Sequence, residues 1–72
     1  MKATTARINA AIAKHNVEIV KNVADAYFYL TGEGMLGAYE DSISIPRLSD
    51  QPLERWIADC EALIEAAREN RE

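Results

Sequence analysis

An apolar stripe at helical spacing near the C-terminus constrains the fold more than any other feature of the sequence. The residues on this stripe are Leu53, Trp56, Ile57, Cys60, Leu63, Ile64 and Ala67. A stripe this broad must be buried against another layer of structure. The chain has 72 residues and one cysteine, so no internal disulfide can replace that packing. The sequence therefore predicts one small domain, residues 1–72, whose stability depends on a single hydrophobic core.

Signals for two helices lie at the two ends of the chain. Near the N-terminus, Ile8, Ile12 and His15 follow helical spacing after the hydroxyl residues Thr4 and Thr5. This pattern predicts a helix over about 4–15, and Asn16 is suited to the left-handed residue that closes a helix. The C-terminal helix is expected to begin after an N-cap at Ser49 or Asp50, with Pro52 in its first turn.

The hydrophobic period changes to two between these helices. Alternating or β-branched segments predict strands over 17–21, 26–30 and 42–45, and Pro46 is expected to end the third. Residues 22–25 read as a turn between the first two strands. The order is then α-β-β-β-α, which indicates an α+β fold with a three-stranded antiparallel sheet and two helices packed on one face.

Successive side chains of a strand point to opposite faces, so the alternation assigns each strand residue to one side of the sheet. The side expected to face the helices carries Val17, Ile19, Ala26, Phe28, Leu30, Ile43 and Ile45. The opposite side is expected to carry Glu18, Val20, Tyr27, Tyr29, Ser42 and Ser44. Two tyrosines and a valine on an open sheet face make this the most informative surface in the sequence.

Charge and composition exclude several classes of function. The chain holds 12 acidic and 8 basic residues, a balance that disfavours binding to duplex DNA. The acidic excess lies in the C-terminal helix and the basic excess in the N-terminal one, so the two helices are expected to lie side by side. No segment approaches the roughly 18 continuous apolar residues of a membrane span. With no apolar leader visible, and Cys60 on an apolar helix face, a cytoplasmic location is expected.

Three features of the sequence are candidates for catalytic or binding chemistry. Gly32, Gly34 and Gly37 form a GxGxxG pattern, but a strand rather than a helix is predicted after it, which favours a flexible loop over a phosphate site. His15 is more typical of a last helical turn than of a general base. Cys60 is expected to be a buried structural thiol. No catalytic residue, metal ligand, cofactor or small-molecule substrate is predicted.

Two surfaces are candidates for binding a partner. The first is the sheet face of Val20, Tyr27 and Tyr29. This face fits ordinary cross-strand packing, a protein interface, or stacking on single-stranded nucleic acid. Lys21 and Arg47 are the only basic residues nearby, which disfavours nucleic acid. The second is the loop 31–41, whose apolar residues are expected at a mobile tip. These loop residues are Met35, Leu36 and Tyr39.

The chain also resembles a family of small phage and prophage proteins. The resemblance rests on the strand 17–21, on Tyr27-Phe28-Tyr29, on the segment 42–49 and on the start of the tryptophan-bearing helix at 53–56. It spans roughly residues 8–64. Relatives carry a glycine-rich hairpin where this chain has residues 22–25, so the turn departs from the family pattern. The resemblance implies a mobile-element origin and supplies no agreed activity.

Together these observations predict a non-enzymatic protein that binds a macromolecule of a bacterial host cell, and the expected partner is a protein or a protein complex. An inhibitor of a host defence system such as CRISPR or restriction is one version of this prediction. A homodimer or other homo-oligomeric accessory module, paired through the open sheet face or an edge strand, is the alternative. Single-stranded nucleic-acid binding through the tyrosines is a further alternative.

Overall fold

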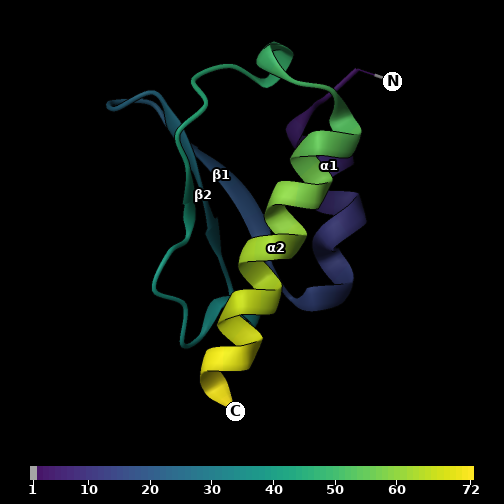
Figure 1. Ribbon diagram of the computed structural model, residues 1–72. Coiled ribbons are helices and arrows are strands. Elements are labelled where there is room, and N and C mark those ends of the chain that lie inside the picture. The colour runs from purple at the N-terminus through teal and green to yellow at the C-terminus, as the bar shows by residue number, and fades with distance from the viewer. Residues whose placement is uncertain (1) are drawn as a thin grey trace.

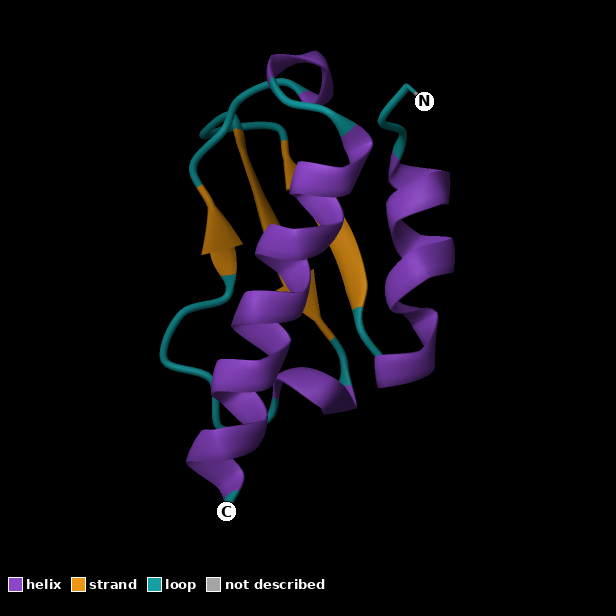
Figure 2. Cartoon of the chain, turned by 45° about the vertical axis from the view of Figure 1, so that its right-hand side comes forward, coloured by secondary structure: helices purple, strands orange, loops and turns teal. Residues whose placement is uncertain are grey.

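The computed structural model describes residues 2–72, and it shows two helices on one side of a three-stranded sheet (Figures 1 and 2). The main elements are α1 (Thr5–Ile12), β1 (Glu18–Asn22), β2 (Tyr27–Thr31), β3 (Ser42–Ile43) and α2 (Leu53–Arg71). Three single 3₁₀ turns, η1 (Ala13–His15), η2 (Glu33–Met35) and η3 (Leu48–Asp50), connect them. The predicted α+β class and the order α-β-β-β-α are confirmed.

Local signals set the bounds of the N-terminal helix. The Thr4 hydroxyl accepts a hydrogen bond from the Arg7 amide at 3.1 Å, which caps α1. After η1, Asn16 adopts the left-handed conformation with φ of 58°, as its position predicted. The chain therefore reverses directly into β1, and α1 lies beside α2 on the sheet (Figure 2).

The sheet has the strand order β1-β2-β3, and both pairings are antiparallel. Ile19 pairs with Leu30, and Phe28 pairs with Ile43, so these four side chains share the face that the helices cover. All four are buried, as the alternation predicted. Val20 pairs with Tyr29 on the opposite face, as expected.

Trp56 of α2 lies at the centre of the core. Its side chain is 0% exposed, and its ring meets Phe28 edge to face with the centroids 5.0 Å apart. The indole Nε1 donates a hydrogen bond of 2.9 Å to the carbonyl of Leu48. The tryptophan therefore joins α2 both to the central strand and to the segment that precedes the helix.

The structure corrects three details of the predicted fold. The third strand covers only Ser42–Ile43, since the chain leaves the ladder before Pro46, which has no amide to donate. Ala26 is exposed rather than inward-facing, because it occupies the β1–β2 turn with φ of 52°. Ser49 and Asp50 lie in η3 and do not cap α2, whose N-cap position is the extended Pro52.

Candidate functional site

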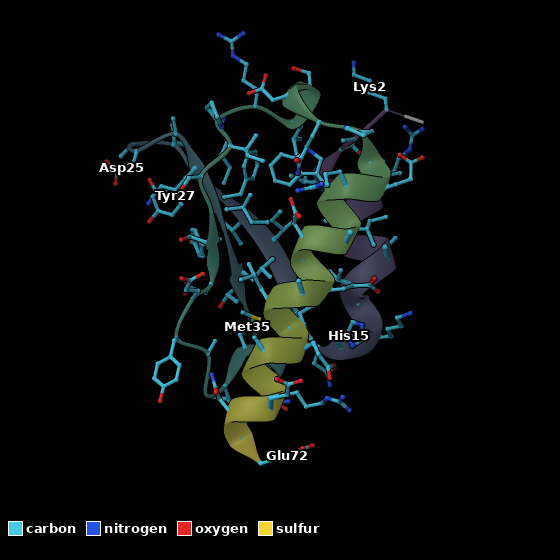
Figure 3. All side chains as sticks on the ribbon, in the orientation of Figure 1. Lys2, His15, Asp25, Tyr27, Met35 and Glu72 are labelled. Carbon is cyan, nitrogen blue, oxygen red and sulfur yellow. The ribbon has the colours of Figure 1, made fainter. Side chains whose placement is uncertain are left out.

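The open face of the sheet presents Val20, Tyr27 and Tyr29, here called the tyrosine face. The three side chains are half-buried, and no helix covers them. The two tyrosine rings lie 6.3 Å apart with a tilt of 53°. Asn22 donates a hydrogen bond of 3.0 Å from Nδ2 to the Tyr27 hydroxyl, which fixes that ring near the β1–β2 turn. Figure 3 shows Tyr27 on the side of the sheet away from α2.

Charge is nearly absent from the tyrosine face. Its remaining strand positions are Glu18, Asn22, Thr31 and Ser42. Lys21 belongs to the other face, because it pairs with Phe28 and its Nζ lies 5.9 Å from the Phe28 ring centroid. The three strands therefore place no lysine or arginine beside the tyrosines.

The loop after β2 presents Leu36 and Tyr39 to solvent, with exposures of 62% and 91%. The expectation that Met35 also stands at the loop surface is wrong, because Met35 is 9% exposed and belongs to the hydrophobic core. The turn η2 folds the loop back against α2, and Figure 3 shows Met35 beside that helix. The loop thus has a structural role that its composition did not reveal.

The glycines of the GxGxxG pattern serve this packing. The Gly34 amide donates a hydrogen bond of 3.2 Å to the carbonyl of Asn16. A Cβ atom at Gly34 would lie 2.1 Å from the His15 carbonyl oxygen and 2.5 Å from Val17 Cγ2. Gly32 has φ of 124°, a conformation that L side chains rarely adopt. The pattern therefore reports close backbone contact with the η1–β1 junction, and the structure gives it no phosphate-site geometry.

Arg71 fastens the same loop to the last turn of α2. Its Nη1 donates hydrogen bonds of 2.9 Å to the carbonyls of both Gly34 and Leu36. These bonds join residues that are 37 and 35 positions apart in the chain. Leu36 is held in place by its main chain while its side chain stays exposed, so the loop is a fixed surface rather than a free tip.

A cavity of about 390 Å³ lies between this loop and the facing sides of η1 and α2. Its lining residues are His15, Gly34, Glu61, Ile64, Glu65, Arg68 and Arg71. His15 Nε2 lies 3.8 Å from Glu61 Oε2, and Arg68 pairs with Glu65. Arg68 and Glu65 thus form an ion pair, and Glu61 faces the His15 imidazole. The lining offers no hydroxyl or thiol nucleophile. Between residues 2 and 72, no group of three or more His, Cys, Asp or Glu side chains could hold a metal ion.

Cys60 lies on the buried side of α2 and is fully enclosed by the core. Burial, together with the smaller effect of the negative charges of Asp59 and Glu61, raises the pKa of its thiol to about 12. Because the thiolate is the reactive form, the folded protein should resist a thiol-specific reagent at mildly alkaline pH.

We expect Cys60 to react with such a reagent at least a hundredfold more slowly in the folded protein than in the same protein unfolded by guanidinium. A time course of absorbance after mixing measures both rates. An exposed cysteine introduced by Val23→Cys in a Cys60→Ala background is the control for reagent access. Equal rates for Cys60 in the two states would contradict a buried, protonated thiol.

Sequence reasoning missed one surface, which lies between β3 and α2. Two adjoining hollows of about 230 and 270 Å³ share Leu63 as a wall. Exposed Ala62 and Ala66 lie one helical turn apart beside them. In the sequence, the only sign of this surface was a pair of small residues one helical turn apart. Alanine is common on helix surfaces because of its high helix propensity, so this sign does not indicate a hollow.

Comparison of the chain with protein-family models, curated proteins and solved structures returned no match. In the described part of the chain, no helix is both long enough and apolar enough to cross a membrane.

Proposed function

We propose that this protein is a binding protein without catalytic activity, and that another protein covers its tyrosine face. The observation that carries the proposal is an apolar and aromatic surface on a sheet whose other face packs against the two helices. Tyrosine is enriched in protein interfaces because its ring supplies contact area and its hydroxyl supplies a hydrogen bond. Tyr29 and Tyr27 offer both at fixed positions.

Charge favours a protein partner over a nucleic acid. Single-stranded nucleic acids bind stacking platforms that also carry basic residues for the phosphates. The tyrosine face has Glu18 as its only charged strand residue, and Lys21 lies on the opposite side. A protein surface with apolar groups and hydrogen-bond donors for the tyrosine hydroxyls fits this face better.

The partner would belong to the cytoplasm of a bacterial host cell. This part of the proposal depends on the resemblance of residues 8–64 to phage and prophage proteins. An inhibitor of a host defence system such as CRISPR or restriction is one form that it takes. The mechanism would be steric, with the tyrosine face covering a working surface of the partner. The exposed side chains of Leu36 and Tyr39 in the loop after β2 are further candidate contacts.

A second copy of the chain is the alternative partner. The tyrosine face is nearly uncharged, so two such faces can meet across a two-fold axis without repulsion. Light scattering on the purified protein distinguishes the two cases before any partner is known. A monomer at low micromolar concentration supports a different protein as the partner.

The double variant Tyr27→Ala/Tyr29→Ala should lose the partner while keeping the fold. Removing two interface aromatics costs about 2 kcal/mol or more, which is about thirtyfold in Kd. The partner is captured from a bacterial lysate on immobilised protein, purified, and titrated against wild type and the double variant. Val23→Ala, an exposed apolar truncation in the β1–β2 turn, is the matched control and should bind like wild type.

Circular dichroism verifies that both variants keep their secondary structure. Equal Kd values for wild type and the double variant would refute the tyrosine face as the binding surface. A stable wild-type dimer that the double variant abolishes would instead assign this face to self-association. Salt-sensitive binding of wild type to a single-stranded oligonucleotide, lost in the double variant, would replace the protein partner with nucleic acid.

A further inference from the structure

The two edges of the sheet differ in how their main-chain groups are satisfied. At the β1 edge, the outward amide of Ile19 donates a hydrogen bond of 2.7 Å to Asn9 Oδ1 of α1. Lys21 also lies on this strand, and a charged side chain discourages pairing with another chain. The β1 edge is therefore closed to a further strand by α1 and by charge.

The β3 edge carries main-chain groups that point outward. Leu30 donates a hydrogen bond of 2.7 Å to the carbonyl of Asp41, which fixes the alternation of the β2–β3 ladder. Tyr29 and Ser42 then form a pair that exchanges no hydrogen bond, so the Ser42 amide and carbonyl face away from β2. Within residues 2–72, no group outside the ladder bonds to either of them. The edge therefore offers one donor and one acceptor to an added main chain.

The two hollows described above lie directly beside this edge, and we call them the β3–α2 groove. Residues 38–40 and β3 form one wall of this groove, and Ala62, Leu63 and Ala66 of α2 form the other. Most of these are apolar or small, so side chains of a strand added to β3 would find space and apolar contact against α2. Unpaired strand groups next to an apolar helix surface are the arrangement required for recognition by strand addition.

We propose that the β3–α2 groove binds a short extended segment of a partner protein, added as a strand beside β3. The main chain of this segment would bond to the Ser42 amide and carbonyl. Its apolar side chains would lie against Ala62, Leu63 and Ala66. The segment is short because β3 has two residues and Pro46 soon follows, so the edge cannot extend further.

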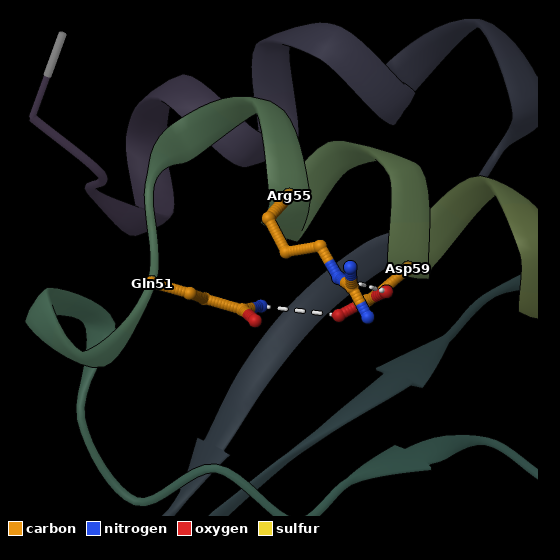
Figure 4. A network of polar contacts seen from close by, with 3 residues as sticks. All are labelled: Gln51, Arg55 and Asp59. Carbon is orange, nitrogen blue, oxygen red and sulfur yellow. Dashed lines mark hydrogen bonds and ion pairs between the residues drawn. The ribbon is translucent and has the colours of Figure 1, made fainter.

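Charge identifies the segment as basic. The only charged residues that line the groove are Glu40 and Asp59, and both are acidic. Asp59 is already bonded by Arg55 at 3.2 Å and by Gln51 at 3.1 Å, as Figure 4 shows. Glu40 and the adjacent Asp41 form no ion pair in the described chain and remain to attract a lysine or arginine. A second copy of the chain would bring the same acids together, so a different protein is favoured.

A displayed library of random nine-residue peptides tests this proposal without knowledge of the natural partner. We expect selection on the wild-type protein to enrich peptides that alternate apolar residues and carry at least one lysine or arginine. Ala62→Arg fills the groove and repels a basic segment, and it should weaken binding of an enriched peptide at least tenfold. Ala10→Arg makes the same change on the exposed surface of α1 and is the matched control, expected to bind like wild type.

Methylation of the peptide amide that pairs with Ser42 should also weaken binding at least tenfold, since it removes the main-chain bond and keeps every side chain. Enrichment of no peptide, or enriched peptides insensitive to Ala62→Arg, would overturn the proposal. A wild-type dimer dissociated by Ala62→Arg would assign the groove to a second copy. Tyr27→Ala/Tyr29→Ala should leave peptide binding unchanged, so failure of the groove and failure of the tyrosine face can be distinguished.

Discussion

Trp56→Ala is expected to remove about 3–5 kcal/mol from the free energy of unfolding, because it truncates the largest fully buried side chain of the core. The side chain is 0% exposed and packs edge to face on Phe28. The substitution also leaves the Leu48 carbonyl without its indole donor. A chain of this length has a total stability of about 4–11 kcal/mol, so the substitution should remove a large fraction of the free energy of unfolding.

Urea unfolding followed by circular dichroism measures this effect, because the signal does not depend on the tryptophan itself. Trp56→Phe keeps an aromatic ring against Phe28 but loses the hydrogen bond to Leu48, and we expect it to lose less than half as much stability. Ala10→Arg, the exposed substitution on α1, should unfold within about 0.5 kcal/mol of wild type. A Trp56→Ala variant within 1 kcal/mol of wild type would contradict the central position of this residue.

Gly34→Ala is expected to cost about 3 kcal/mol, at the upper end of the range for added volume in a packed site. The new methyl group would meet the His15 carbonyl oxygen at 2.1 Å, and a main-chain atom cannot rotate away as a side chain does. Relief therefore requires the loop to move. Such a movement would stretch the hydrogen bond from the Gly34 amide to the Asn16 carbonyl. It would also withdraw Met35 from the core.

The matched control is Glu33→Ala, which changes an exposed residue of the same 3₁₀ turn. It should unfold within about 0.5 kcal/mol of wild type. Urea unfolding compares the two variants, and limited proteolysis shows whether the loop 31–41 is released in Gly34→Ala. A Gly34→Ala variant as stable as its control would mean that the glycine is not needed for the contact with η1.

Much of the fold could be predicted from periodicity. Ile8 and Ile12 mark the buried side of α1, and Ile19, Phe28, Leu30 and Ile43 mark the buried side of the sheet. These predictions succeeded because spacing along a helix or strand determines which residues share a face. The predicted end of β3 and the predicted N-cap of α2 were wrong. A strand ends where its pairing with the neighbouring strand ends, and a helix begins where the preceding turn allows, and neither is set by periodicity.

The candidate surfaces were predicted unevenly. Tyr27 and Tyr29 lie on the open face, as their alternation with Phe28 indicated. Met35 does not lie on the loop surface, because η2 turns it into the core. The β3–α2 groove was not predicted at all, since its walls come from segments about twenty residues apart whose approach no local pattern reports.

The sequence by itself determined the elements, their order and the face that each one buries, because these follow from the spacing of neighbouring side chains. Only the tertiary structure decided which surfaces stay uncovered. Arg71 reaches Gly34 across 37 residues, and Gly34 reaches the junction that follows α1. Such contacts depend on the distance between residues in space and not on their spacing in the chain. These contacts hold the loop 31–41 against the core. They leave the tyrosine face and the β3–α2 groove open.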